Sequence, residues 1–398
     1  MSDSFVDVGV HQKRKHGEGA DGDVFLSRKT DDGRIISVLS DGLGSGIKAG
    51  VLATLTATMA LRFIAEDIPP KRAAQIIMKT LPVCKERKIS YATFTIVDID
   101  NANTVRIIEY DNPPFLLVRN DTLIEPIKTP MEVKRRRSRT GSPIVRNEIL
   151  HYSEYRARPG DRIVFFSDGV VQSGMGSRVR PLGWGNPKAQ EYTRKVVMEN
   201  PTISARDLAR RLVKEAESHD GYEAKDDISC AVIYFRKPRN TLVMSGPPVD
   251  PAHDGDMATI FTDFEGRRIL CGGTTANIIS RELNRPVRVN LRMLDPSIPP
   301  PSTMEGADLV TEGILTLGRV AELLEGGATA GNSTNAATKL VDLLLDSDRI
   351  EFLVGTRINE AHQDPNMPVE LEIRRSIVKR IARALEERYL KETSVRFI

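Results

Sequence analysis

The chain has 398 residues, a length that predicts two or three domains rather than a single core. Its 40% hydrophobic and 28% charged residues are typical of a folded globular protein and exclude a disordered chain. Lys and Arg number 57 against 54 Asp and Glu, a balance that does not by itself indicate a nucleic-acid partner. The N-terminal residues lack an apolar signal region, and no uninterrupted apolar run approaches the ~20 residues that span a bilayer. We therefore expect a cytoplasmic protein with no membrane partner.

The first block of the sequence combines strand-like segments with amphipathic helices. Runs rich in β-branched and aromatic residues, bounded by turn formers, predict strands. Apolar residues at helical spacing predict helices over 48–66 and 204–219. The elements do not alternate regularly between strand and helix, which argues against an all-parallel doubly wound sheet. The predicted strands cover residues 34–40, 91–100, 104–111, 115–121, 161–169 and 226–236.

A domain boundary is expected near residues 236–240, where Pro and Gly become more frequent. We assign residues 1–240 to one domain and 241–398 to a smaller α/β domain. In the second domain the pattern predicts a strand, turn and helix over 267–283, a helical segment over 308–327 and a buried strand at 350–355. A closing amphipathic helix is expected over 368–391. The three isolated cysteines, Cys84, Cys230 and Cys271, are expected to be reduced packing residues.

The stretch SVLSDGLGSGIKAG, residues 37–50, leads from a predicted strand through a glycine cluster into a helix. Residues 44–49 satisfy the form of a dinucleotide-binding turn, G-x-G-x-x-G/A. That interpretation also needs a second strand ending in an acidic residue ~20 positions later, and this region is instead the end of a helix. Asp41 would moreover repel a pyrophosphate, and a P-loop is excluded because Ala49 follows Lys48. A plain strand–turn–helix corner, with glycines supplying left-handed dihedrals, stays open.

Aspartates recur at the ends of the predicted strands, as Asp41-Gly42, Asp168-Gly169 and Asp226-Asp227. Carboxylates gathered in one place stay ionised only if a positive charge neutralises them, and Mg²⁺ and Mn²⁺ prefer such oxygen ligands. Two such ions ~3.5 to 4 Å apart can clamp a phosphoryl group and ionise a bridging water. Without a Cβ, Gly42 lets its carbonyl approach a metal. Each aspartate taken alone could equally be a turn residue or a helix cap.

Five segments follow one another along the first block: GEGADGDVFLS, SVLSDGLGSGIKA, DNPPFLL, RPGDRIVFFSDGVVQSG and KDDISCAVIYF. In this order they resemble the metal-dependent type 2C protein phosphatases, in particular the bacterial branch typified by stage II sporulation protein E. The likeness covers residues 1 to about 240, and the second domain resembles no family that we recognise. The resemblance implies an α+β fold for the first domain. In this fold two packed antiparallel sheets form an antiparallel β-sandwich that is flanked by helices. The resemblance also implies two Mn²⁺ or Mg²⁺ ions that activate water to hydrolyse phosphoserine or phosphothreonine.

The resemblance also assigns roles to individual residues. Asp41 would bridge both ions and Gly42 would offer its carbonyl. Asp168 and Asp226 would complete the first metal site, and Asp23 would hold water bound to the ions. Asp41 and Asp23 are therefore the expected catalytic residues.

The sequence departs from the family pattern in one position and leaves a second undecided. Eukaryotic members carry a histidine after the Asp-Gly pair as general acid, whereas this chain has Leu43. The proton donor therefore remains unassigned. Motif alignment favours Asp226 as the metal ligand, with Asp227 as the alternative.

The function implied by the resemblance is that of a protein serine/threonine phosphatase acting on a bacterial regulatory protein, such as a phosphorylated anti-sigma-factor antagonist. The alternative is a non-catalytic pseudophosphatase that docks a partner through the same fold. Because every expected metal position is acidic, the sequence favours the enzyme. A homodimer stays open, and the closing helix could contribute to such a contact.

Two further motifs carry charge or free backbone groups. The run KRRRSR, residues 134–139, is either a solvated loop or a docking patch, formed by Arg135, Arg136 and Arg137, for an acidic or phosphorylated partner. It lacks interleaved aromatic residues, so nucleic acid is not expected. The helix start at Gly272, Gly273, Thr274 and Thr275 could bind an anion and make the second domain a regulatory sensor. The alternative is a capped helix without a ligand.

Overall fold

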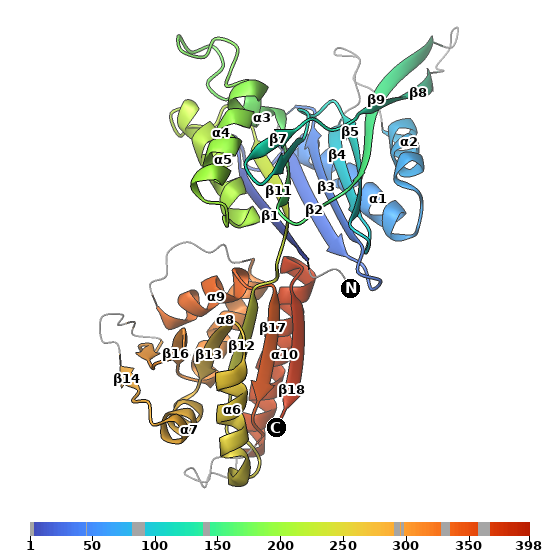
Figure 1. The fold of residues 1–398 in the computed structure, drawn as a ribbon. Helices are drawn as coiled ribbons and strands as arrows, with labels where there is room; N and C mark the ends of the chain where they lie inside the picture. Colours follow the sequence, from blue (N-terminus) through green and yellow to red (C-terminus); the bar gives the residue numbers. More distant parts are fainter. Residues whose placement is uncertain are drawn as a thin grey trace. The chain divides into compact units, whose positions relative to one another are not determined.

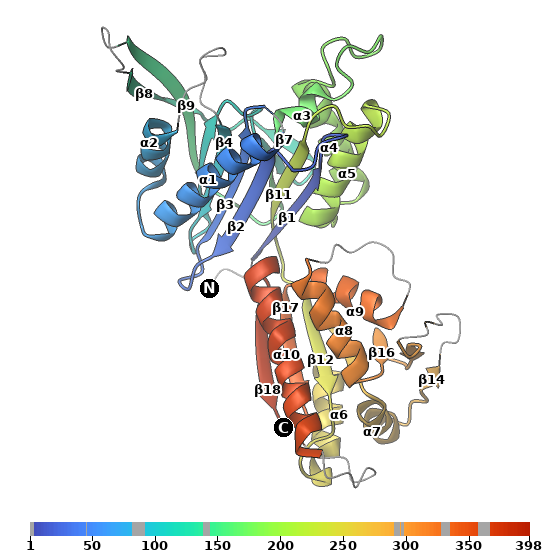
Figure 2. The same cartoon turned by 180° about the vertical axis from the view of Figure 1, so that it is seen from behind.

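The computed structural model of the chain describes residues 4–44, 46–81, 92–137, 144–289, 295, 298–327, 335–356 and 367–398. It divides into two compact units, Met1–Lys237 and Pro238–Ile398, which Figures 1 and 2 show from opposite sides. Cys84 lies outside the described residues, whereas Cys230 and Cys271 are free and buried, as expected for packing residues.

The first unit contains two antiparallel sheets. Its strands are β1 (Phe5–Lys13), β2 (Asp23–Lys29), β3 (Ile35–Gly42), β4 (Ala92–Ile99), β5 (Thr104–Tyr110), β6 (Leu116–Arg119), β7 (Thr122–Ile124), β8 (Thr129–Arg137), β9 (Ile144–Arg156), β10 (Asp161–Phe166) and β11 (Ile228–Arg236). One sheet has the order β1-β11-β10-β6-β7, and the other has the order β2-β3-β4-β5-β9-β8. Their inner faces share a core that includes Leu39, Ile107, Phe165 and Ile233.

Helices cover the outer faces of both sheets (Figure 1). The helices α1 (Gly46–Ala65) and α2 (Pro70–Thr80) pack on the β3 sheet, and α3 (Asp168–Gln172), α4 (Asn186–Glu199) and α5 (Ala205–His219) pack on the β11 sheet. Each helix buries its apolar stripe against a sheet, as amphipathic spacing predicts. The α+β prediction of an antiparallel sandwich flanked by helices is therefore confirmed.

Helix α1 combines small buried side chains with an exposed apolar edge. Within the described ranges it is long and apolar enough to cross a membrane by length and composition, although Lys48 and Arg62 interrupt its apolar residues. Its buried face includes Ala53, Ala57 and Ile64. Of these, Ala57 and Ile64 belong to the apolar core that α1 and α2 form with the β3 sheet. These contacts are those of a core helix.

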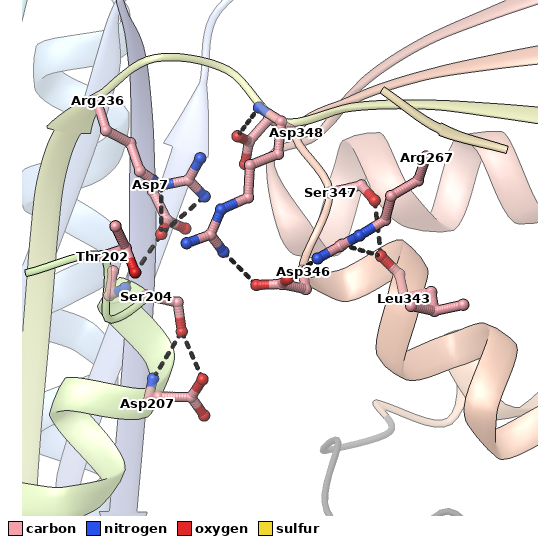
Figure 3. Close-up of polar contacts among 12 residues, drawn as sticks. Asp7, Thr202, Ser204, Asp207, Arg236, Arg267, Leu343, Asp346, Ser347 and Asp348 are labelled. Atoms are coloured by element: carbon pink, nitrogen blue, oxygen red, sulfur yellow. Dashed lines mark hydrogen bonds and ion pairs between the residues drawn. The ribbon is translucent and has the colours of Figure 1, made fainter. Parts of the chain in front are cut away.

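A buried ion pair lies at the end of β11 in the first unit (Figure 3). The Arg236 guanidinium donates to Asp7 Oδ2 over 3.2 Å, and both side chains are nearly fully buried. The same carboxylate oxygen accepts from the backbone N–H of Ala205, the first residue of α5. Asp7 therefore ties β1, β11 and α5 together.

The second unit is built on a mainly parallel sheet with the order β14-β15-β16-β13-β12-β17-β18. Its strands are β12 (Asn240–Ser245), β13 (Arg267–Cys271), β14 (Arg288–Val289), β15 (Ser302–Thr303), β16 (Leu309–Thr311), β17 (Arg349–Val354) and β18 (Glu392–Phe397). The five strands β16, β13, β12, β17 and β18 run parallel, whereas β14 and β15 pair antiparallel at one edge. The expected α/β character is confirmed.

Helices lie on both faces of this parallel sheet. The helix α6 (Asp254–Asp263), preceded by the short turn η1 (Pro251–His253), and α7 (Gly273–Leu283) share one apolar core with it. The helices α8 (Ile314–Glu325), α9 (Ala336–Leu345) and α10 (Met367–Tyr389) share the other. Within this unit Asp346, after α9, accepts hydrogen bonds from Arg239 and Arg267 (Figure 3).

Two predictions for the second unit were wrong in detail. Residues 309–311 belong to β16 rather than to a helix, because they pair with β13, and α8 begins only at Ile314. The closing helix ends at Tyr389, and the chain then forms β18 beside β17. Leu390 has a φ of 55°, a left-handed conformation that ends the helix and turns the chain back toward the sheet.

Candidate metal centre

Asp23 and Asp41 lie directly opposite each other on neighbouring antiparallel strands. Asp23 is the first residue of β2, and Asp41 is the penultimate residue of β3. Directly opposed carboxylates repel each other, so this pairing is unfavourable unless a cation or a proton intervenes. The strand register thus places two of the predicted site residues together.

Asp168 and Asp226 come from the other sheet of the first unit. Asp168 begins α3 two residues after the end of β10, and Asp226 lies two residues before β11. The strands β10 and β11 are antiparallel, and the Ser167 N–H donates to the Ser229 carbonyl over 3.0 Å where they meet. The end of one strand therefore lies beside the start of the other.

The four carboxylates influence one another electrostatically. Burial raises the pKa of Asp41 well above its ordinary value, and the charges of Asp23, Asp168 and Asp226 raise it further. Burial likewise raises the pKa of Asp226, with a further contribution from Asp168. The ends of the two sheets thus bring Asp41, Asp168 and Asp226, which the strand-end pattern grouped, together with Asp23, which only the family resemblance suggested.

Asp23 is the most buried member of this group, which we call the aspartate cluster (Asp23, Asp41, Asp168 and Asp226). Burial raises its pKa to about 8, while the hydroxyls of Ser229 and Ser167 oppose that rise. Its Oδ2 atom is fully buried and has no hydrogen-bond partner among the described residues. A buried carboxylate oxygen without a partner is costly, and a cation would remove that cost. The cluster therefore has the donor chemistry that Mg²⁺ or Mn²⁺ requires.

Asp227 makes contacts of a different kind. Its two oxygens accept from the backbone N–H groups of Lys15, over 3.0 Å, and Gly22, over 2.8 Å. The carboxylate thus holds the loop between β1 and β2 against the start of β11. The neighbouring Asp226 is left to face Asp168 and Asp41.

Two glycines allow the backbone to pack closely around the cluster. A Cβ on Gly42 would lie 2.1 Å from the carbonyl oxygen of Ala49, in the first turn of α1. A Cβ on Gly169 would lie 2.1 Å from the carbonyl oxygen of Asp227. Any other residue would push α1 away from β3, or α3 away from the start of β11.

The aspartates are near one another without forming a closed ligand set. Among the described residues no three His, Cys, Asp or Glu side chains are already arranged around one point that could hold a metal ion. Asp41 and Asp168 nevertheless lie close enough for a side-chain hydrogen bond, which contributes to the raised pKa of Asp41.

A family comparison identifies the first unit. The family model described as stage II sporulation protein E (SpoIIE) matches residues 31–236, just over half of the chain. The chain belongs to the SpoIIE family. The resemblance to the stage II sporulation protein E branch that the sequence predicted is confirmed. No curated protein sequence matches the chain.

Several solved structures are similar to this SpoIIE-family chain. The phosphatase domain of SpoIIE from Bacillus subtilis is 17% identical, with a TM-score of 0.42 over 59% of this chain and 94% of that one. The RsbU and RsbW domains of a Mycobacterium tuberculosis protein are 17% identical, with a TM-score of 0.44 over 65% of this chain and 67% of that one. RsbX in complex with magnesium is 14% identical, with a TM-score of 0.39 over 58% of this chain and 95% of that one.

One carboxylate near the cluster was missed from the sequence. Asp111 follows β5 directly and has a φ of 56°. Burial raises its pKa, and Glu148 and Asp168 add to the rise. Its place after a strand is the signal that marked the other aspartates, and it opens the segment DNPPFLL, which resembles a SpoIIE-family motif.

The remaining predicted site residues belong to other elements of the chain. Arg135, Arg136 and Arg137 form the end of β8, and their side chains are outside the described part of the structure. Gly272, Gly273, Thr274 and Thr275 lie at the junction of β13 and α7 in the second unit. Leu43 follows Gly42 and supplies no proton donor.

Proposed function

We propose that this protein is a protein serine/threonine phosphatase that uses two Mn²⁺ or Mg²⁺ ions. The observation that carries the proposal is the aspartate cluster, four mutually repelling carboxylates with an unpartnered buried oxygen on Asp23. Family membership supplies the reaction class, because the SpoIIE family includes PP2C-type phosphatases.

The bound ions would supply a nucleophilic water at neutral pH and positive charge for the phosphoryl group. Asp41 would hold both ions, with the Gly42 carbonyl beside it and with Asp168 and Asp226 as further ligands. Asp23, between the hydroxyls of Ser167 and Ser229, would hold a proton of the attacking water.

We assign the ligand role to Asp226 rather than Asp227. Both Asp227 oxygens already accept hydrogen bonds from backbone N–H groups. Metal binding by Asp227 would break these hydrogen bonds, which hold the loop before β2 in place. One Asp226 oxygen accepts the Asp227 N–H over 3.0 Å, and the carboxylate still lies close enough to Asp168 for repulsion to raise its pKa.

The proposed substrate is a phosphoserine or phosphothreonine on a bacterial regulatory protein, such as an anti-sigma-factor antagonist, in the cytoplasm. Arg135, Arg136 and Arg137 are proposed to dock it, because guanidinium groups match phosphate and carboxylate geometry. Residues 1–240 would carry the reaction, and residues 241–398 would regulate it.

Turnover by the full-length chain separates this enzyme from a pseudophosphatase. We expect hydrolysis of p-nitrophenyl phosphate and of a phosphoserine peptide with Mn²⁺ or Mg²⁺, and none after exhaustive chelation. Asp41→Asn should lose nearly all turnover, whereas Asp121→Asn, at an exposed turn, should retain it. Binding of the phosphopeptide without turnover at any metal concentration would identify a pseudophosphatase.

A further inference from the structure

A pocket opens at one end of the first unit. Its volume is about 620 Å³, which lies in the range of small-molecule sites. Four segments meet there: the residue before β1, the turn between β4 and β5, the turn between β9 and β10, and the residue after β11. Together they contribute Ser4, Asn103, Arg156, Arg158 and Lys237 to its lining.

This pocket lies at the opposite edge of the sandwich from the aspartate cluster. In the register, the row that begins at Ile35, the first residue of β3, ends at Tyr155, next to Arg156. Asp41 lies near the other end of β3, about 20 Å away along an extended strand. The direction of β11 agrees, because Asp226 precedes its start and the pocket residue of this strand follows its end. The pocket is therefore separate from the proposed metal site.

Hydrogen bonds hold the walls of the pocket together. Asn103 has a φ of 59°, and its side-chain amide donates to the Ser4 hydroxyl over 3.0 Å. The Asn103 carbonyl accepts from the Ala157 N–H over 2.9 Å, which ties the turn after β4 to the turn after β9. The Gly160 N–H donates to the Phe235 carbonyl, near the end of β11, over 2.7 Å. These bonds fix the four segments relative to one another.

The charged side chains that line the pocket in the described part of the chain are all cationic. They are Arg156, Arg158 and Lys237, each of them exposed, and we call this site the basic pocket. None of the three side chains forms an ion pair with a described carboxylate. A concave surface that carries charge of one sign concentrates ions of the opposite sign. The basic pocket is therefore suited to an anion.

Carboxylates on the neighbouring segments have cationic partners of their own. Asp161, which is fully buried, accepts from the Arg119 guanidinium over 2.7 and 2.9 Å. Asp100 and Glu154 both pair with Arg106, over 3.0 and 3.6 Å. These carboxylates do not neutralise the cations of the basic pocket.

We propose that the basic pocket binds a diphosphate group, either free or carried by a small molecule. A guanidinium group can bond two phosphate oxygens at once, and the pocket has two such groups with a lysine beside them. One phosphate group carries a charge of about −1.5 to −2 at pH 7, so three cations match two linked phosphates better than one. This site does not depend on whether the first unit is an active phosphatase.

The experiment uses the full-length chain in chelator, so that the aspartate cluster holds no metal and repels anions. At low salt, where surface charges are least screened, titration calorimetry should give a Kd of about 1 mM or tighter for inorganic pyrophosphate. Inorganic phosphate should bind about tenfold more weakly, because it makes fewer charged hydrogen bonds. An equal Kd for ADP and pyrophosphate would assign recognition to the diphosphate group, and a smaller Kd for ADP would add the attached group.

Variants of the two arginines separate binding from folding. Arg156→Gln and Arg158→Gln each remove one cation and keep a polar side chain. Both residues are exposed, so the urea midpoint, followed by the fluorescence of Trp184, should stay at the wild-type value. Each variant should raise the Kd for pyrophosphate about tenfold. The matched control Arg72→Gln, at an exposed position of α2, should keep the wild-type Kd.

Four results would overturn the proposal. The first is a wild-type chain that binds no pyrophosphate, and the second is a chain that binds phosphate as tightly as pyrophosphate. The third is wild-type affinity in a chain that carries both Arg156→Gln and Arg158→Gln. The fourth is an equal loss of affinity in Arg72→Gln, which would indicate diffuse attraction to the whole chain rather than binding in the basic pocket.

Discussion

Replacing Asp23 with Asn should flatten the pH dependence of the stability of the metal-free first unit. In the folded chain, burial raises the pKa of Asp23 to about 8, from an ordinary value of 3.8. The folded state therefore keeps a proton on this carboxyl over a pH range in which the unfolded chain has released it. Asn cannot titrate, and it has nearly the same shape.

The sign and size of the effect follow from this difference in bound protons. A raised carboxyl pKa stabilises the fold below the unfolded value, and that stability is lost as the pH rises toward 8. Between these limits each such carboxyl lowers the free energy of unfolding by about 1.4 kcal/mol per pH unit. Because the pKa of Asp41 is also raised, Asp23→Asn should remove part of the slope.

The assay can report on the first unit alone. Trp184 is the single tryptophan of the chain, and it is buried beside Tyr192 and His219 in the core under α4 and α5. Urea unfolding of the full-length chain in chelator, followed by the fluorescence of Trp184 from pH 5.5 to 7.5, gives the slope for wild type and variant. Mn²⁺ should stabilise wild type increasingly as the pH rises, because binding must displace the protons.

Two results would contradict a proton on Asp23 in the folded, metal-free chain. If metal-free wild type is equally stable from pH 5.5 to 7.5, Asp23 does not hold a proton in the fold. If Asp23→Asn keeps the full wild-type slope, the titrating group is another residue. The variant Asp121→Asn, at an exposed turn, should show the wild-type slope.

Three further predictions concern the surroundings of the aspartate cluster. Asp227→Ala should lower the free energy of unfolding by about 2 to 3 kcal/mol, because two backbone N–H groups lose a charged acceptor. Asp226→Ala should keep the metal-free stability and lose turnover. If instead Asp226→Ala unfolds more easily and Asp227→Ala loses only turnover, the roles of the two residues are exchanged. Gly42→Ala should cost about 1 to 3 kcal/mol in urea unfolding and lose activity, since its Cβ would overlap a carbonyl, while Gly19→Ala, in open space, should match wild type. Replacing Arg135, Arg136 and Arg137 by Gln should lower kcat/KM for a phosphoprotein and leave that for p-nitrophenyl phosphate unchanged, and equal losses for both substrates would argue against docking.

The sequence contained enough information to group the aspartates but not to separate their roles. Asp41, Asp168 and Asp226 each lie at a strand end, and strand ends of a packed sandwich meet at its edges, so their association could be expected. The identity of the residues that Asp227 contacts could not, because Lys15 and Gly22 lie more than 200 positions away along the chain. Only the folded register shows that its oxygens are already in use.

The fold of the second unit was less predictable for a related reason. Three residues of β16 are too short for a periodic pattern, and they become a strand only because β13 lies beside them. Leu390 ends α10 in a left-handed conformation that a leucine rarely adopts, so the sequence did not mark the turn into β18. The order of the parallel strands depends on such tertiary pairings.

The binding of Mn²⁺ tests the central claim, that the aspartate cluster is a two-metal site, most directly. Paramagnetic resonance of free Mn²⁺ during titration of the full-length chain counts the ions bound. We predict two bound ions per chain for wild type and for Asp121→Asn. Asp41→Asn should lose both high-affinity ions, because it removes the ligand proposed to hold them together. An Asp41→Asn chain that binds two ions with wild-type affinity, or a wild-type chain that binds none, would contradict the claim.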